Sequence, residues 1–111
     1  MNDLKIAIIG GSGFVGTYLS RELKKNNIAY KVCDIVKSKA FDDTLNVDVE
    51  KFNTLSILKD FNCIINLAAV HRDDIRPLSR YDDVNVSGAK NICLAARKYN
   101  INKIIFTSSV A

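Results

Sequence analysis

The stretch that decides the fold is Leu4-Lys5-Ile6-Ala7-Ile8-Ile9, followed directly by Gly10-Gly11-Ser12-Gly13-Phe14-Val15-Gly16. The apolar run is typical of a strand buried on both faces, and the glycines predict a tight turn after it. Apolar residues at helical spacing (Val15, Leu19 and Leu23) begin at once. In this order of strand, turn and helix, bare backbone N–H groups at a helix N-terminus can bind a pyrophosphate.

The glycines fit two registers of a phosphate-binding motif. Gly11, Gly13 and Gly16 fit G-x-G-x-x-G, whereas Gly10, Gly13 and Gly16 fit G-x-x-G-x-x-G. In either register an early glycine permits the turn, Gly13 admits a phosphate, and Gly16 lets the helix lie close to the strand. The alternative is an ordinary strand–helix turn rich in small residues. Because Asp34 ends a second apolar run downstream, the pattern favours a dinucleotide-binding turn.

The composition is that of a globular domain. The chain has 111 residues, of which 48% are hydrophobic and 25% are charged, so it is one domain or a piece of one. No apolar run approaches the roughly 20 residues of a membrane span, and the N-terminus has no signal-peptide pattern. The net charge of +4 comes from scattered basic residues without interleaved aromatic residues. We therefore expect a cytoplasmic protein that binds neither membrane nor nucleic acid.

The three cysteines, Cys33, Cys63 and Cys93, lie far apart and each stands in an apolar segment. Neither their number nor their spacing fits a disulfide framework or a metal site. We predict three reduced thiols in the core, as in a cytosolic protein, and no bound metal.

Strands and helices alternate along the chain. Apolar patterns predict strands near 4–9, 29–34, 45–48, 62–67 and 103–107, and helices near 14–26, 51–59 and 81–99. The alternation predicts an α/β fold of three layers, a doubly wound parallel sheet of order 3-2-1-4-5 that ends after strand five. Ligands of such sheets bind at the carboxyl ends of strands one and four, where the order reverses.

Two carboxylates lie at the ends of predicted strands. Asp34 can accept hydrogen bonds from both hydroxyls of an adenosine ribose and would repel a 2′-phosphate, which favours NAD over NADP. A solvated strand-end acid is the alternative, and Lys37 and Lys39 could attract that phosphate. Asp48 could accept a hydrogen bond from the adenine amino group, with Val49 packed on the ring, or it could cap the next helix.

Small residues and the only histidine follow the fourth strand. The segment Asn66-Leu67-Ala68-Ala69 leaves room for the middle of a cofactor. His71 is either a catalytic residue or an ordinary loop residue. Asn85 shares a helix face with Gly88 and Ile92, so its amide points toward the sheet and requires a partner. That partner would be the loop after strand four or the cofactor.

Hydroxyl groups close the fifth strand, in Thr107-Ser108-Ser109. They could bind a substrate carbonyl or a sugar hydroxyl, or cap a following helix. The strand itself, Ile104-Ile105-Phe106, is apolar and predicted at the edge of the sheet. An open apolar edge predicts self-association of the chain, or a homodimer.

Together these segments resemble the extended short-chain dehydrogenase/reductases, specifically the NAD-dependent epimerase/dehydratase family that acts on nucleotide sugars. The resemblance covers essentially the whole chain and rests on the order and spacing of six segments. These are Gly10–Gly16, Asp34, Asp48-Val49, Asn66–His71, Tyr81–Ile92 and Phe106–Ser109.

The resemblance implies roles for the matched residues. The cofactor residues are Phe14 and Val15 (backbone at the pyrophosphate), Asp34 (ribose), Asp48 and Val49 (adenine), and Leu67, Ala68, Ala69, His71 and Asn85 (nicotinamide half), with Thr107 and Ser108 near them. Ser109 aligns with the catalytic serine or threonine of the family. The complete enzyme would transfer a hydride from a sugar carbon to NAD, Ser109 would polarise the resulting carbonyl, and epimerisation or dehydration would follow.

The sequence departs from the family in one respect, because it stops before the family's Tyr-x-x-x-Lys pair. Tyr99 is followed by Lys103 at the spacing of that pair, but it cannot replace the family's tyrosine, since it precedes Ser109 in the chain. We therefore expect residues 1–111 to be the NAD(P)-binding domain of a longer enzyme, inactive alone. The alternatives are a reductase or dehydrogenase of the same superfamily that acts on a non-sugar carbonyl, and a non-catalytic NAD-sensing module.

Overall fold

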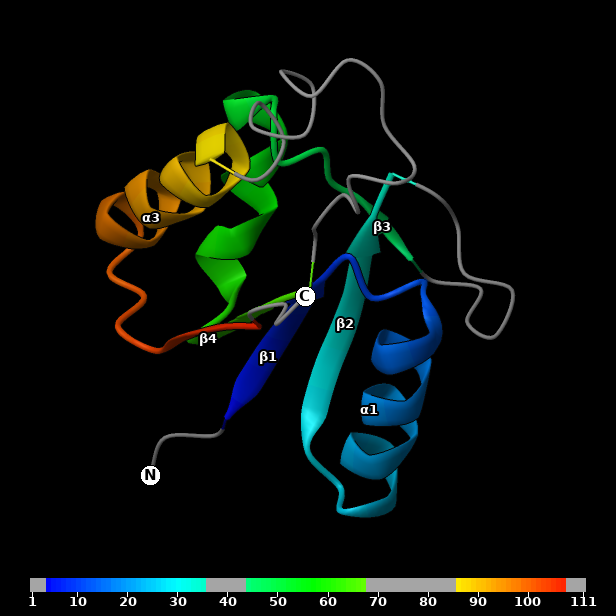
Figure 1. The fold of residues 1–111 in the computed structure, drawn as a ribbon. Helices are drawn as coiled ribbons and strands as arrows, with labels where there is room; N and C mark the ends of the chain where they lie inside the picture. The colour runs from blue at the N-terminus through cyan, green and yellow to red at the C-terminus, as the bar shows by residue number, and fades with distance from the viewer. Residues whose placement is uncertain (1–3, 36–43, 68–85, 108–111) are drawn as a thin grey trace, which may run out of the picture.

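The computed structural model describes residues 4–35, 44–67 and 86–107 (Figure 1). Five strands of these residues form one parallel sheet in the order β3-β2-β1-β4-β5. The strands are β1 (Lys5–Ile9), β2 (Ala29–Asp34), β3 (Leu45–Asn46), β4 (Cys63–Asn66) and β5 (Ile104–Phe106), and the helices are α1 (Phe14–Lys25), η1 (Phe52–Asp60) and α3 (Gly88–Lys98). The predicted α/β class and strand order are confirmed.

Strand β1 is central and is buried on both faces, as its apolar run predicts. Its side chains alternate: Ile6 and Ile8 pack with α1, whereas Ala7 and Ile9 pack with η1 and α3. Figure 1 shows the resulting layers, with α1 on one side of the sheet and η1 and α3 on the other. Because helices cover both faces, the ligand-binding groups are found at the edge where the strands end.

The register brings the carboxyl ends of the strands to one edge. Ile9 of β1 is opposite Cys33 of β2 on one side and Asn66 of β4 on the other. Asn66 in turn is opposite Phe106 of β5. The segments that follow β1, β2, β4 and β5 therefore begin at the same level.

Strand β3 is shorter than the predicted segment 45–48. The N–H of Val47 still donates to the carbonyl of Asp34, but the N–H of Asp48 donates to the hydroxyl of Thr54 at 3.0 Å. From Asp48 onward the chain turns toward η1, which ends its pairing with β2.

The helix predicted over 51–59 is a 3-10 helix, η1, of nine residues. Such long 3-10 segments are uncommon, and here the apolar residues recur every three positions, at Phe52, Leu55, Leu58 and Phe61. Leu55 and Leu58 are fully buried. With three residues per turn these side chains lie on one face, which explains why the 3-10 form packs well.

Helix α3 lies within the range predicted for it, 81–99, whose residues 81–85 are outside the described ones. Its buried positions include Gly88, Ile92 and Ala96, as expected. Cys93 falls on the opposite face and is exposed, so the prediction of a core thiol is wrong there. Cys33 and Cys63 are buried as predicted.

Strand β5 lies at one edge of this sheet, as predicted, with Ile105 and Phe106 53% and 44% exposed. None of the helices that the structure describes is long and apolar enough to cross a membrane.

Candidate functional site

The β1–α1 turn (residues 10–13) begins with a glycine that no other residue replaces easily. Gly10 has φ of 76°, in the left-handed region, where a side chain would be strained. Its N–H donates to the carbonyl of Cys33 at 2.7 Å, which fastens the turn to β2. The early glycine therefore has the role that the sequence predicts for it.

Gly16 and Gly11 pack against each other. A Cβ on Gly16 would overlap the carbonyl oxygen and the Cα of Gly11. A Cβ on Gly11 would lie 2.9 Å from the carbonyl oxygen of Ile8 and 3.0 Å from Cγ1 of Val32. The close approach predicted for Gly16 is thus made to the turn rather than to the strand itself.

Gly13 is the N-cap of α1 and faces open space. No atom of the described residues lies within 4 Å of the position that a Cβ would occupy. In the part of the chain that the structure describes, no side chain caps α1, and the first turn of the helix has no acidic residue. The N–H groups and the positive end of the helix dipole can therefore bind an anion. This is the arrangement that a dinucleotide pyrophosphate requires, so the residues present fit that group.

Asp34 lies beside this turn. Its Oδ2 accepts a hydrogen bond from the N–H of Ser12 at 3.1 Å, and its Oδ1 accepts one from the N–H of Ile35 at 2.8 Å. The carboxylate is half-buried at the tip of β2. The structure therefore brings together the two parts of the motif, the glycine turn and the downstream acid.

The thiol of Cys33, directly before Asp34, is chemically inert in this position. Burial, and then the negative charge of Asp34, raise its pKa from 9.0 to about 12. Burial also raises the pKa of Cys63, against a smaller opposite effect of Lys103. Both thiols stay protonated at neutral pH and are poor nucleophiles.

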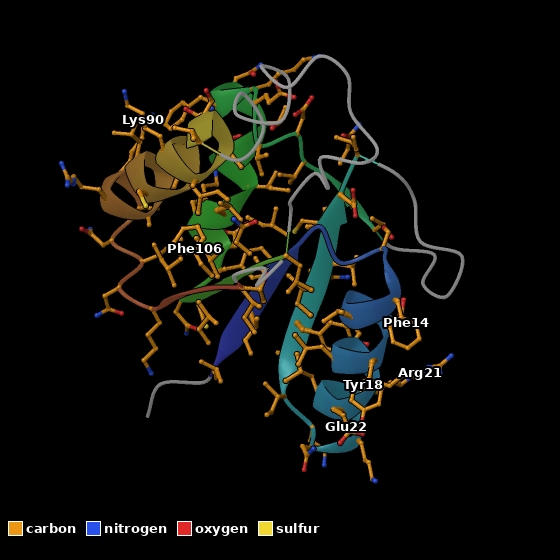
Figure 2. All side chains as sticks on the ribbon, viewed as in Figure 1. Phe14, Tyr18, Arg21, Glu22, Lys90 and Phe106 are labelled. Carbon is orange, nitrogen blue, oxygen red and sulfur yellow. The ribbon has the colours of Figure 1, made fainter. Side chains whose placement is uncertain are left out.

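A groove of about 340 Å³ runs along α1 from the turn. It is lined by Ser12, Gly13, Phe14, Thr17, Tyr18 and Arg21. Figure 2 shows Phe14, Tyr18 and Arg21 pointing away from the sheet. Phe14 and Val15 are 88% and 58% exposed, so their side chains are not needed by the core. Both residues remain candidates for binding through the backbone.

The β3–η1 turn (residues 47–51) holds the second predicted carboxylate. Oδ1 of Asp48 accepts from the N–H of Glu50 at 3.0 Å, whereas the N-cap of η1 is Lys51, whose side chain makes no capping bond. Asp48 therefore closes the turn before the helix instead of capping it. Val49 is only 7% exposed, because its side chain lies under Gly88. Little of the Val49 side chain is left to contact a ligand, and its predicted packing on an adenine ring stays a prediction.

Leu67 and Thr107 lie on the other side of β1 from Asp34. The N–H of Leu67 donates to the carbonyl of Ile9 at 2.7 Å. The N–H and the hydroxyl of Thr107 both lie 3.3 Å from the carbonyl oxygen of Asn66 and donate to it. The remaining predicted site residues are outside the described ones; they are Ala68, Ala69, His71, Asn85, Ser108 and Ser109.

Three polar residues of this edge were not predicted: Ser12, Thr54 and Asn91. Ser12 contributes its backbone, which no sequence pattern reveals. Thr54 accepts from the N–H of Asp48, and Nδ2 of Asn91 donates to the carbonyl of Val49 at 2.8 Å. A polar residue next to the buried position Ile92 could have indicated Asn91. Among residues 4–35, 44–67 and 86–107, no three metal-ligating side chains gather.

The sequence was compared with known families and proteins. Residues 7–111 match the sequence model of the 3-beta hydroxysteroid dehydrogenase/isomerase family. The chain is 42% identical over 113 residues to the N-acetyl-alpha-D-glucosaminyl-diphospho-ditrans,octacis-undecaprenol 4-epimerase of Escherichia coli O157:H7, which covers 100% of this chain and 34% of that protein. It is 31% identical over 123 residues to a decarboxylating sterol-4-alpha-carboxylate 3-dehydrogenase of Saccharomyces cerevisiae. That match covers 94% of this chain and 34% of that protein.

The fold was compared with solved structures. It matches the UDP-glucose 4-epimerase of Thermus thermophilus in complex with NAD with a TM-score of 0.84 and 20% identity, over 96% of this chain and 38% of that one. At this identity the likeness shows the fold alone. The chain spans about a third of the length of the curated relatives named above.

Proposed function

This chain belongs to the 3-beta hydroxysteroid dehydrogenase/isomerase family, one of the extended short-chain dehydrogenase/reductases, and from that premise we propose that residues 1–111 are the NAD-binding domain of an epimerase or dehydratase. Its substrate is a sugar carried on a diphosphate, as in a nucleotide sugar. The observation that carries the proposal is the hydrogen bond from Ser12 N–H to Asp34 Oδ2. It supports the proposal because an acid that could bind a ribose then lies beside a turn whose N–H groups could bind an anion.

Different described residues bind different parts of the cofactor. The first turn of α1, from Gly13 through Phe14 and Val15, binds the pyrophosphate through backbone N–H groups. Asp34 binds the adenosine ribose and disfavours a 2′-phosphate, so NAD is preferred to NADP. Asp48 and the backbone of Val49 bind adenine.

The other half of the site is formed from the segments after β4 and β5. We assign the nicotinamide half to Leu67, Ala68, Ala69, His71, Asn85, Thr107 and Ser108. Reversible acceptance of a hydride is the chemistry that a nicotinamide cofactor supplies when bound. Ser109 donates a hydrogen bond to the substrate oxygen at which a carbonyl develops. We expect the proton acceptor to be a tyrosine from another part of the complete enzyme, and residues 1–111 alone to be inactive.

Two comparisons support this function. The 42% identical relative is named as a 4-epimerase of a sugar attached through diphosphate to a polyprenol. A relative from Lactobacillus helveticus, 31% identical over 120 residues, is named as a UDP-glucose 4-epimerase. Both kinds of substrate present a sugar on a diphosphate. The turnover assays described below distinguish a nucleotide sugar from a lipid-linked sugar.

Calorimetric titration of the full-length protein with NAD and NADP tests the cofactor site. We expect NAD to bind more tightly, and Gly13→Trp to abolish binding because the indole would fill the space over the turn. Lys90→Trp is the matched control, since Lys90 is exposed on α3. The proposal is refuted if neither nucleotide binds, or if Gly13→Trp binds NAD like the unmodified protein.

Turnover assays test the substrate class. We expect the full-length protein to interconvert a UDP-hexose, or a UDP-N-acetylhexosamine, with its epimer without net consumption of NAD. A polyprenyl-diphosphate N-acetylhexosamine is the second arm, which would identify a lipid-linked sugar instead. The assignment of chemistry to residues beyond Ala111 fails if residues 1–111 alone turn over either substrate.

The sterol dehydrogenase relative favours a second candidate, a dehydrogenase that acts on a non-sugar alcohol. The two functions differ in NAD balance, since an epimerase returns the hydride and a dehydrogenase releases NADH. Accumulation of NADH, followed by its absorbance, with a sterol alcohol and none with sugar diphosphates would favour the dehydrogenase.

We also propose that β5 associates with another strand, because Ile105 and Phe106 are exposed at its edge. The 111-residue chain is expected to self-associate at high concentration by light scattering. A monodisperse monomer would contradict this.

A further inference from the structure

Helix α3 holds the β3–η1 turn at two points, and both act on Val49. Nδ2 of Asn91 donates to the carbonyl of Val49 at 2.8 Å, across 42 positions of sequence. Gly88 lies against the side chain, since a Cβ there would come within 2.7 Å of Cγ2 of Val49. Val49 is therefore fixed by its backbone and by its side chain, and it belongs to the core on the α3 side of the sheet.

The same turn is closed from within around Asp48. Its N–H donates to the hydroxyl of Thr54 at 3.0 Å, and its carbonyl accepts from the N–H of Lys51 at 2.9 Å. Oδ1 accepts from the N–H of Glu50 at 3.0 Å, which sets the orientation of the carboxylate. Among the described residues no donor contacts Oδ2. The half-buried carboxylate is thus held by one oxygen and presents the other.

A carboxylate oxygen followed by a backbone N–H is an acceptor next to a donor. Adenine presents the matching pattern, because its amino group donates and the adjacent ring nitrogen N1 accepts. Hypoxanthine presents the reverse pattern, with an oxygen at the first position and an N–H at the second. Asp48 and Val49 can distinguish the two bases only if their relative orientation is maintained.

We propose that Asn91 is a positioning residue for adenine recognition. By holding the carbonyl of Val49, it fixes the Val49–Glu50 peptide plane, whose N–H donates to Oδ1 of Asp48, and so keeps the carboxylate of Asp48 in register with the N–H of Val49. The inference rests on the proposed function, namely that the site binds NAD. Asn91 acts through Val49 and does not contact the cofactor.

The test compares the dissociation constants of NAD and nicotinamide hypoxanthine dinucleotide for the full-length protein, measured by calorimetry. The unmodified protein is expected to prefer NAD by about tenfold or more, the effect of one hydrogen bond to a charged group. Asn91→Asp has nearly the same shape but replaces the Nδ2 donor with a carboxylate oxygen. We expect this variant to lower the preference for NAD to about threefold or less. Without the bond from Asn91, the β3–η1 turn no longer keeps the carboxylate of Asp48 aligned with the N–H of Val49.

Two further variants separate positioning from general stability. Asn91→Gln retains an amide donor and should give a preference between those of Asn91→Asp and the unmodified protein. Lys90→Ala, on the exposed position next to Asn91, should leave the preference unchanged. If Asn91→Asp does not fold, Asn91→Ala provides the same comparison without a new charge.

The outcomes are distinguishable. If the unmodified protein binds neither dinucleotide, the proposed function fails. If it binds both equally, Asp48 and Val49 do not distinguish the bases and the inference is overturned. If the unmodified protein prefers NAD and the Asn91 variants weaken both ligands by the same factor, Asn91 is only structural and the inference is again overturned.

Discussion

The β1–α1 turn and the β3–η1 turn each involve a strand-end aspartate, but the two carboxylates are held differently. Asp34 accepts from the N–H of Ser12, 22 positions earlier in the chain. Asp48 accepts from the N–H of Glu50, two positions later. The first bond exists only after β2 has paired with β1, whereas the second can form in any chain segment that makes the turn.

The two turns also differ in what fills them. In the β1–α1 turn, glycines keep side chains out: Gly16 packs on Gly11, and Gly13 leaves open space. In the β3–η1 turn, side chains fill the interior, with Thr54 and Asn91 bonded to its backbone. We propose that the first turn admits a diphosphate because it lacks side chains, and that the second presents an acceptor–donor pair because side chains hold its backbone. The following predictions test this difference.

The largest effect is expected from Gly16→Ala. The new methyl would overlap the backbone of Gly11, which cannot move like a side chain, so the free energy of unfolding should fall by about 3 kcal/mol. Urea unfolding followed by circular dichroism measures this. Gly13→Ala is the matched control and should change stability by no more than about 0.5 kcal/mol. Equal stabilities of the two variants would contradict the close packing of Gly16.

The next prediction separates the two aspartates by what each recognises. Asp34→Asn should weaken NAD binding by about tenfold or more and reduce the preference for NAD over NADP, because the charge that repels a 2′-phosphate is lost. Asp48→Asn should preserve that preference and reduce the preference for NAD over the hypoxanthine dinucleotide. Calorimetry with the three dinucleotides measures both ratios. If each variant reduced both preferences by the same factor, the assignment of the ribose to Asp34 and of adenine to Asp48 would be wrong.

A further effect on stability is expected when valine replaces the threonine whose hydroxyl contacts the backbone of each turn. The hydroxyl of Thr54 accepts from Asp48 N–H and donates to the carbonyl of Asp48 or Lys51 at 2.8 Å. Thr54→Val should therefore lower the free energy of unfolding by about 2 kcal/mol. Thr17 makes one exposed bond to the carbonyl of Gly13, so Thr17→Val should cost about 0.5 kcal/mol. Thermal unfolding tests the order, which a reversed result would refute.

The smallest effect is the pH dependence of the free energy of unfolding that arises from the thiol of Cys33, the residue before Asp34. Because the pKa of Cys33 is raised from 9.0 to about 12, the thiol of the unfolded chain ionises above pH 9 while that of the folded chain does not. The contribution to stability is complete below pH 9 and is lost as pH rises toward 12, with about 1.4 kcal/mol lost by about pH 10. Urea unfolding from about pH 8 to about pH 10 should show a shallower loss for Cys33→Ala than for Cys93→Ala. Equal slopes would contradict the raised pKa.

Much of the fold and part of the site could be predicted because they depend on properties that a residue carries with it. The apolar run of β1 requires burial on both faces, and the alternation of strands and helices leads to a parallel sheet with a reversal of order beside β1. Gly10 indicates a left-handed backbone conformation, and Gly16 indicates a place without room for a side chain. Asp34 is the last residue of its strand, so its position at the carboxyl edge of the sheet was also predictable.

The tertiary structure alone decided which groups meet. The bond between Ser12 and Asp34 depends on the register of β1 and β2, and that between Asn91 and Val49 depends on how α3 lies over the β3–η1 turn. The same packing moved the side chain of Val49 into the core and left Cys93 in solvent. Sequence patterns describe burial and local backbone preference. Contacts between residues 22 or 42 positions apart depend on which faces pack together, and that is settled only when the whole core assembles.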